Sequence, residues 1–130
     1  MIENPSLSIA LPAHDEAENI GPMLDEVVRV ATSLSDGYEV IVVDDGSSDD
    51  TAQEVLHFAT RHPQVRLVQH ERNQGYGAAV YSGLTNARKE WVFFTDSDRQ
   101  FVLDELRLLL EKAEDADMVV GYRAPRRDPA

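Results

Sequence analysis

Short apolar runs alternate along the chain with segments in which apolar residues recur every three or four positions. The runs are too short for stable helices, and their composition is typical of β-strands. They predict strands at residues 7–11, 38–43, 65–70, 91–94 and 117–121. Residues 65–70 alternate most clearly between apolar and polar side chains, so we expect this strand nearer an edge of the sheet.

The intervening segments predict amphipathic helices. The first begins after Asn19, which we expect to cap it, and tolerates Pro22 in its first turn. Its buried stripe recurs at helical spacing: Ile20, Met23, Leu24, Val27, Ala31 and Leu34. Thr51 and Glu54 have the spacing of a capping box at the start of the second helix.

Two further helices follow the third and fourth predicted strands. The earlier one comes after a glycine-bearing turn at residues 73–79, and its inner face carries Val80, Leu84 and Ala87. The later one is expected from Leu103 to Ala113. Alternating strands and helices predict right-handed crossovers onto a parallel sheet. We therefore expect an α/β fold, a three-layer αβα sandwich with a mainly parallel sheet.

Composition limits the class of protein. The 130 residues are 42% hydrophobic, which suits a single domain over residues 1–130. The absence of cysteine excludes disulfide scaffolds and thiolate chemistry and allows a reducing compartment. The net charge of −12 argues against a nucleic-acid partner. No window approaches the roughly 20 apolar residues of a membrane span, and no signal peptide is visible, so we expect a soluble, cytoplasmic protein.

Acid-rich turns follow three of the predicted strands, at residues 12–16, 44–50 and 96–98. Ligands of open parallel sheets bind outside the carboxyl ends of the strands. We therefore expect the functional site at that edge. Each turn taken alone also fits an ordinary helix N-terminus, where Asp, Ser and Asn are favoured.

Asp96, Asp98 and Gln100 are the candidate metal ligands. Alternate residues of an extended segment point the same way, so their oxygen atoms converge if strand geometry continues past Thr95. Carboxylate and carbonyl oxygens suit Mg²⁺ or Mn²⁺, which completes its shell with water and substrate phosphate. Asp-x-Asp also occurs in solvated loops, and Asp98 alternatively caps the helix that begins at Leu103.

Asp44 and Asp45 directly follow a buried strand, and two adjacent acids exceed what one helix cap requires. We expect at least one of them to accept hydrogen bonds from ribose hydroxyls or a base N–H. Asp49 and Asp50 fit a capping role.

Gly75 and Gly77 either relax a turn or admit a phosphate, and their spacing matches neither common nucleotide-binding glycine motif, so we favour structure. The remaining candidate side chains lack both metal-ligand spacing and the setting of a catalytic serine. We interpret them as structural or solvated: His14, His57, His62, His70, Ser47 and Ser48.

Four motifs, in order, resemble the family 2 glycosyltransferases of GT-A fold, in particular the polyprenyl-phosphate sugar transferases. Residues 11–16 resemble the family's Pro-x-Tyr-Asn-Glu opening, with His14 at the Tyr and Asp15 at the Asn. Residues 42–47 match its second strand end, residues 73–78 its glycine turn, and residues 96–100 its Asp-x-Asp-x-Gln. The resemblance extends over nearly the whole chain, from about Leu7 to Arg123.

This resemblance implies a metal-dependent, inverting transfer of a sugar from a UDP- or GDP-linked donor, with a polyprenyl phosphate at the cytoplasmic face of a membrane as acceptor. The implied donor-binding residues are Pro12, Ala13, Glu16, Asp44, Asp45, Asp96 and Ser97. Asp96 and Asp98 would be catalytic, and with Gln100 they would hold Mg²⁺ or Mn²⁺. Arg123 would meet the acceptor or the leaving phosphate.

The family's catalytic domain is longer than this chain, so the resemblance implies the donor-binding part of a domain whose acceptor side is truncated. Two alternatives remain open on the sequence: a nucleotide-sugar-binding half-domain without turnover, and a nucleotidyltransferase. The latter is disfavoured because residues 13–19 lack Gly, Lys and Arg to hold a triphosphate. A receiver-like signalling domain fits the spread of acids less well. The base, the sugar and the acceptor stay open.

Overall fold

The computed structural model describes residues 3–95 and 103–113. The elements in residues 3–95 are β1 (Leu7–Ala13), α1 (Ile20–Leu34), β2 (Tyr38–Asp45), α2 (Thr51–Ala59), β3 (Val65–His70), α3 (Tyr76–Asn86) and β4 (Trp91–Phe94). α4 (Leu103–Ala113) belongs to a separate compact unit and is a helix over the residues that its leucine spacing predicts. The predicted strand at residues 117–121 lies outside the described residues.

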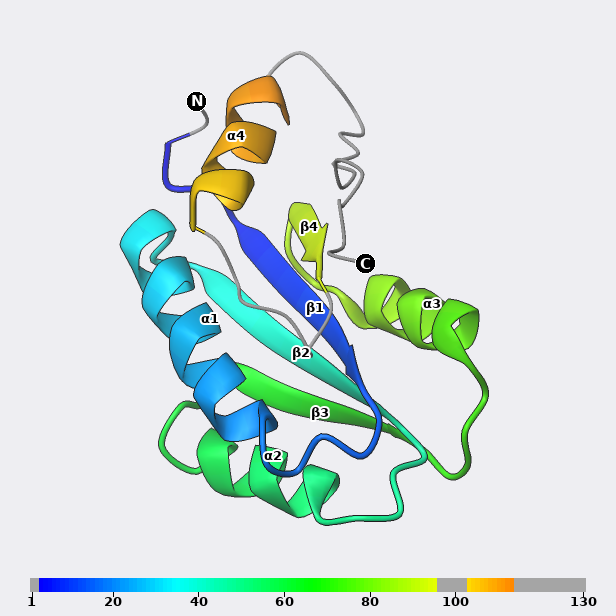
Figure 1. The fold of residues 1–130 in the computed structure, drawn as a ribbon. Helices are drawn as coiled ribbons and strands as arrows, with labels where there is room; N and C mark the ends of the chain where they lie inside the picture. The colour runs from blue at the N-terminus through cyan, green and yellow to red at the C-terminus, as the bar shows by residue number, and fades with distance from the viewer. Residues whose placement is uncertain (1–2, 96–102, 114–130) are drawn as a thin grey trace, which may run out of the picture. The chain divides into compact units, whose positions relative to one another are not determined.

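The strands form a parallel sheet in the order β3-β2-β1-β4 (Figure 1). β3 lies at an edge of the sheet as far as the structure describes it, as its alternating pattern predicts. α1 and α2 cover one face, and α3 covers the other. The predicted three-layer αβα arrangement with a parallel sheet is therefore confirmed.

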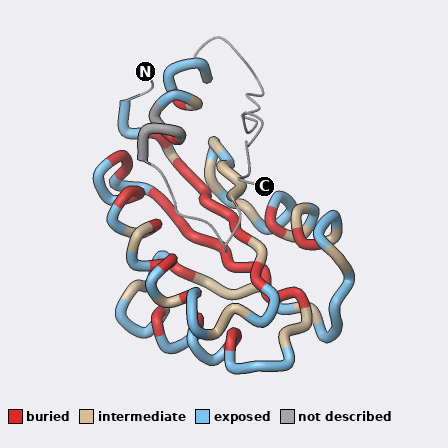
Figure 2. The backbone as a smooth tube through the Cα atoms, viewed as in Figure 1, coloured by how far each residue is buried: buried red, intermediate tan, exposed pale blue. Residues whose placement is uncertain are grey.

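The core lies along β1 and β2, whose residues are almost all buried (Figure 2). The predicted stripe of α1 is buried, and Val30 joins it. On the opposite face Ala10, Ile41 and Val43 pack with Ala79 of α3. No helix in the described ranges is both long enough and apolar enough to cross a membrane.

The first strand is longer than the sequence predicts, because Pro12 does not end it. The N–H and C=O groups of one residue in a parallel strand face the same neighbouring strand, and those of the next residue face the other neighbour. The carbonyl of Ala10 accepts from Thr95 N–H at 3.0 Å on the β4 side. The nitrogen of Pro12 faces that same side, beyond the last described β1–β4 pair, Ala10–Phe94. Pro12 therefore removes no donor from the β1–β2 ladder.

The second strand also continues, through Asp44 and Asp45, where the sequence predicts a turn. These residues pair in register with Gln69 and His70 of β3. Successive side chains of a strand point to opposite faces, so the two carboxylates lie on different sides of the sheet. Both positions are buried, which is feasible because each carboxylate has hydrogen-bond donors within reach.

The predicted inner face of α3 is wrong at Leu84, which is 50% exposed. The helix instead packs through its small residues Ala79 and Gly83. A Cβ atom on Gly83 would lie 3.1 Å from the Cβ of Ala10, so the helix sits close to the sheet. Close packing through small residues rotates the bulky Leu84 away from the core.

Two predicted helix caps are also wrong. Asn19 occupies the N-cap position of α1, but its side chain makes no cap hydrogen bond. The N-cap of α2 is Asp50, not Thr51, so Thr51 and Glu54 form no capping box. The hydroxyl of Thr51 instead accepts from the Glu16 N–H and donates to the carboxylate of Asp49.

A buried carboxylate joins the amino ends of the strands. Glu39 accepts from the Ser8 hydroxyl at 2.6 Å, from Arg66 Nε at 3.0 Å and from the Arg88 backbone N–H at 2.7 Å. Burial raises the pKa of Glu39, but these donors outweigh it and hold the pKa below its ordinary value. The Lys89 N–H completes the cluster by donating to Ser8 at 3.1 Å. This cluster fixes the sheet at the edge opposite the acid-rich loops.

Candidate functional site

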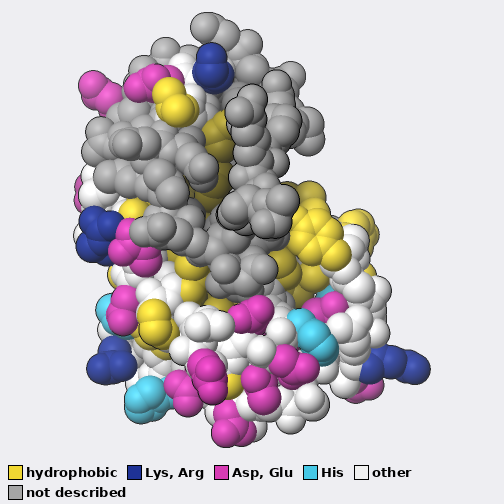
Figure 3. Space-filling model, in the orientation of Figure 1, with side chains coloured by type: hydrophobic (Ala, Val, Ile, Leu, Met, Phe, Trp, Pro, Cys, Tyr) yellow, Lys and Arg dark blue, Asp and Glu magenta, His cyan; other side chains and the backbone are white. Residues whose placement is uncertain are grey.

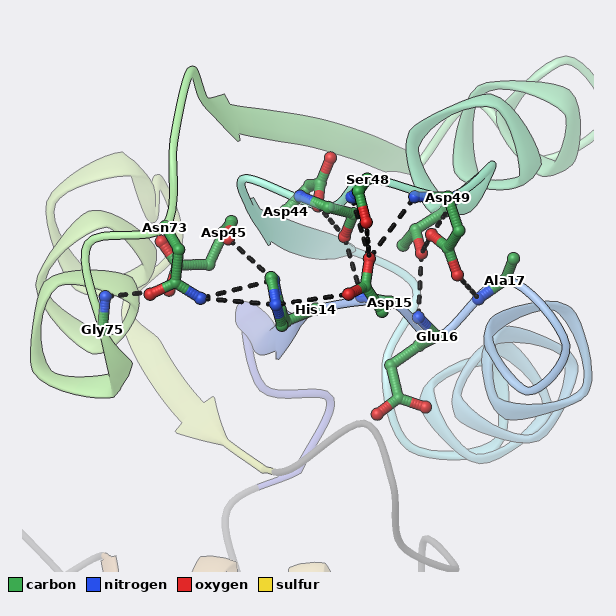
Figure 4. Close-up of polar contacts among 12 residues, drawn as sticks. His14, Asp15, Glu16, Ala17, Asp44, Asp45, Ser48, Asp49, Asn73 and Gly75 are labelled. Carbon is green, nitrogen blue, oxygen red and sulfur yellow. Dashed lines mark hydrogen bonds and ion pairs between the residues drawn. The ribbon is translucent and has the colours of Figure 1, made fainter.

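Three loops meet at the carboxyl ends of the strands: residues 14–19, 46–50 and 71–75 (Figure 4). Consecutive N–H groups of the first loop donate to side chains beyond β2. The pairs are Asp15 to Ser47 Oγ (2.9 Å), Glu16 to Thr51 Oγ1 (2.8 Å) and Ala17 to Asp49 Oδ2 (3.2 Å). The backbone of the first loop is therefore held to the second loop by side-chain acceptors, where no backbone-to-backbone pairing continues from the strands.

Asp15 also supplies an acceptor from the first loop to N–H groups of the second. Its carboxylate accepts from the Ser48 N–H at 2.8 Å and lies 3.4 Å from the Asp49 nitrogen. Its backbone has a φ of 51°, in the left-handed region that Asp and Asn tolerate better than most residues. Sequence reasoning assigned no role to Asp15, because its partners are more than thirty positions away.

Asp45 ties the third loop to β2. It is 5% exposed and accepts from the N–H groups of Gln74 (2.8 Å) and Gly75 (3.0 Å) and from His70 Nδ1 (2.8 Å). Burial raises the pKa of Asp45, but hydrogen bonds from Gln74, His70 and Gly75 outweigh it and hold the pKa below its usual value. The ionised carboxylate is the form that these donors stabilise.

Asp44 has a similar position on the other face of the sheet. It is fully buried and accepts from the Ser47 N–H (3.1 Å), the Ser47 hydroxyl and Gln69 Nε2 (3.4 Å). Both adjacent acids therefore already bind protein donors. A role for either in binding a ligand stays a prediction.

Gly46 allows the third loop to approach the end of β2. Its φ is +70°, and a Cβ atom there would lie 2.2 Å from the backbone nitrogen of Asn73. Gly75, at φ +99°, needs the same backbone freedom but has no atom within 4 Å of a Cβ position. The structural interpretation of Gly75 agrees with its position as the N-cap of α3.

His14 stands where the three loops meet. Its Nδ1 lies 3.0 Å from the carbonyl oxygen of Asp45, which can only accept, so Nδ1 carries a proton. The side-chain amide nitrogen of Asn73 lies 3.4 Å from Nδ1 and 3.5 Å from Nε2, and Asp15 Oδ2 lies 3.4 Å from Nε2. The ring is 45% exposed. It therefore connects the first and third loops to the end of β2 and still faces solvent.

His70 links the end of β3 to α3. Its Nδ1 bonds to Asp45, and its Nε2 lies 2.7 Å from the hydroxyl of Ser82. The connectivity is that of a Ser–His–Asp triad. Ser82 lies inside α3, however, where backbone N–H groups bond to the preceding turn and are not free to stabilise an oxyanion. The arrangement supports a structural function and not hydrolysis.

The structure brings the predicted residues of the first two strand ends together at this edge. Pro12 and Ala13 end β1, where Ala13 pairs with Asp44 of β2 and Asp45 follows. Glu16 is half-buried, and its carboxylate points away from the loop contacts in Figure 4 and accepts from Asn19 Nδ2 at 3.4 Å. The remaining predicted residues lie outside the described ones: Asp96, Ser97, Asp98, Gln100 and Arg123.

Acidic side chains gather over these loops in Figure 3, and Asp15, Asp49 and Asp50 are exposed there. Within residues 3–95 and 103–113, no group of three or more His, Cys, Asp or Glu side chains is arranged to hold a metal ion. A phosphate group at this edge would therefore require either a cation held by other residues or N–H groups that donate to the phosphate oxygens.

The family model described as glycosyl transferase family 2 matches residues 8–129. A dolichyl-phosphate beta-glucosyltransferase of Trichomonas vaginalis is 38% identical over 128 residues, which cover 90% of this chain. A dodecaprenyl-phosphate galacturonate synthase of Rhizobium johnstonii is 29% identical and covers 98% of it. The chain spans 38% of the length of each of these two relatives.

Solved structures of glycosyltransferases are also similar to this chain. A mannosyltransferase from Pyrobaculum calidifontis, in complex with GDP-Man and Mn²⁺, superposes with a TM-score of 0.75 at 30% identity, covering 86% of this chain and 33% of that one. Glucosyl-3-phosphoglycerate synthase from Mycobacterium tuberculosis, in complex with Mn²⁺, UDP and phosphoglyceric acid, gives 0.68 at 26% identity, covering 87% and 40%. The predicted GT-A fold is confirmed.

The close approach at Gly46 predicts a matched pair of substitutions. Gly46→Ala should lower the free energy of unfolding by about 3 kcal/mol, because backbone strain and a clash with Asn73 add together. Gly75→Ala should cost about 1–2 kcal/mol, because it introduces the strain alone. Urea unfolding followed by circular dichroism measures both, and equal losses would show that the loop does not press on Gly46.

The lowered pKa of Asp45 predicts a pH dependence. A depressed pKa contributes stability above the unfolded value of about 3.9 that is lost as pH falls through the folded value. Asp45→Asn should lower stability at pH 7 by about 1–3 kcal/mol, because an amide cannot accept from all three donors. The variant should also lose less stability than the parent as pH falls below about 4. Urea unfolding from pH 7 to pH 2.5 measures this, and parallel curves would contradict it.

Proposed function

Because the chain belongs to glycosyl transferase family 2, we propose that this protein transfers a sugar from a nucleoside diphosphate sugar to a polyprenyl phosphate, with inversion at the sugar carbon. The family match over residues 8–129 supports the reaction class. Two relatives named for dolichyl and dodecaprenyl phosphates support the acceptor class. An acceptor of this kind would place the reaction at the cytoplasmic face of a membrane.

The donor nucleotide binds at the carboxyl ends of β1 and β2 in this proposal. The observation that carries it is the locking of loops 14–19 and 46–50 around those strand ends, which gives a rigid edge built from Pro12, Ala13, Asp44 and Asp45. Rigid placement of binding groups reduces the ordering cost of a ligand. Glu16, whose carboxylate points away from the loop contacts, is the acid at this edge best placed to accept from a ribose hydroxyl.

The segment after β4 is proposed to hold the divalent cation and to contact the phosphates. Asp96, Asp98 and Gln100 carry the carboxylate and amide oxygens that Mg²⁺ and Mn²⁺ prefer, and Ser97, between Asp96 and Asp98 in the sequence, is proposed to contact the donor. When bound, the cation supplies charge neutralisation for the leaving diphosphate. The Mn²⁺ in both solved glycosyltransferases supports this assignment. Arg123 is proposed to meet a phosphate of the acceptor or of the leaving group.

The chemistry of the acceptor decides whether a general base is needed. A phosphate oxygen is already anionic near neutral pH, so a polyprenyl phosphate can attack without losing a proton. A sugar hydroxyl would need a base within hydrogen-bond reach. The proposal of a phosphate acceptor therefore requires no base among the loop residues.

The test is calorimetric titration of UDP and GDP into this chain, with and without Mn²⁺. We expect one nucleotide to bind in the presence of Mn²⁺, and Asp98→Asn to weaken that binding by about tenfold or more, which corresponds to about 1.4 kcal/mol. Asp50→Asn is the matched control, because Asp50 is an exposed acid at the same edge without a side-chain cap bond. No binding of either nucleotide by the folded chain, or equal losses in both variants, would contradict the proposal.

A further inference from the structure

The chain Ser82–His70–Asp45 crosses from the middle of α3 to the end of β2. Asp45 is a carboxylate that only accepts, so Nδ1 of His70 carries a proton, and Nε2 lies 2.7 Å from the hydroxyl of Ser82. His70 and Asp45 have side chains only 9% and 7% exposed. The ring is thus held at both nitrogens inside the protein.

This chain ends on the third loop. The two oxygens of Asp45 accept from the N–H groups of Gln74 and Gly75, and the backbone of Asn73 presses on Gly46. If the carboxylate turned, both N–H groups would lose their acceptor together. His70 is the side chain that prevents this rotation, because it is the one side-chain donor to Asp45 among the described residues.

The same loop reaches the exposed part of the site. Asn73 contacts the ring of His14, and His14 Nδ1 donates to the carbonyl of Asp45. His14 follows directly after Ala13, at the end of the strand proposed to bind the nucleotide. A shift of the third loop would therefore move His14 beside the strand end that is proposed to bind the nucleotide.

We infer that His70 is a positioning residue of the donor pocket: braced by Ser82, it orients Asp45 and so fixes loop 71–75 and the ring of His14. No motif of the sequence singles out His70 or Ser82 for this role. The inference rests on the proposed function for its link to nucleotide binding. The link to the third loop is independent of that function.

Two substitutions of similar size test whether His70 acts through its hydrogen bond to Asp45 or only by filling space. His70→Asn places an amide N–H near the position of Nδ1 and keeps the bond to Asp45. His70→Gln reaches toward the position of Nε2 and keeps the bond to Ser82 instead. His57→Asn, at an exposed position of α2, is the matched control.

The first readout is amide hydrogen exchange of Gln74 and Gly75 by NMR. In His70→Gln, Asp45 loses its side-chain donor and is free to turn, which weakens the hydrogen bonds from Gln74 and Gly75 to its carboxylate. We therefore expect exchange about tenfold faster or more in His70→Gln and near-parental exchange in His70→Asn. Amides of Ile41 and Val42 should stay protected in every variant, which shows that the core is intact. Equal exchange at Gln74 and Gly75 in the Asn and Gln variants would overturn the inference.

The second readout is the dissociation constant of the nucleotide that binds the parent chain. His70→Gln should weaken binding about fivefold to tenfold relative to His70→Asn, as expected for the loss of about one hydrogen bond's free energy. If the parent binds neither UDP nor GDP, the proposed function fails and the exchange readout alone decides the role of His70. If exchange responds but both variants bind nucleotide equally, the link from His70 to the donor pocket is overturned.

Discussion

The carboxylate of Asp45 is the interaction on which the candidate site depends. A charged group at 5% exposure is costly unless several donors satisfy it. Its donors come from β3 and from the third loop, and its own carbonyl accepts from His14 at the end of β1. Three segments distant in sequence are therefore required to meet at one point. The edge of the sheet is rigid because this charge would otherwise be unpaired.

Because successive side chains of a β-strand point to opposite faces of the sheet, the two adjacent acids at the end of β2 stabilise different loops. Asp45 faces α3 and organises the third loop, while Asp44 faces the other layer and organises the turn at Ser47. The first loop then joins that turn through Asp15 and Thr51. Two acids that are adjacent in the sequence thus stabilise loops on opposite faces of the sheet. The acidic groups that remain available for a ligand are those, such as Glu16, whose partners are few.

The sequence allowed the four described strands, the helices and the parallel α/β architecture to be predicted, because periodicity is a local property of the chain. It did not allow the ends of β1 and β2 to be predicted, since these depend on which neighbour Pro12 and Asp45 face. The exposed Leu84 was missed because the approach of α3 to the sheet depends on Gly83 and Ala10, far apart in the chain. The roles of Asp15, His14 and His70 likewise depend on partners that no local pattern reveals.

We propose that the donor nucleotide binds at the carboxyl ends of β1 and β2, beside loops 14–19 and 46–50. That proposal is tested by a ¹⁵N–¹H NMR titration of the chain with the nucleotide and diamagnetic Mg²⁺, following the shift of every backbone amide. We expect the largest shifts at residues 13–16 and 46–48, with little change at Ser8 and Glu39 on the opposite edge. Shifts centred on the amino ends of the strands, or on the exposed face of α3, would contradict it.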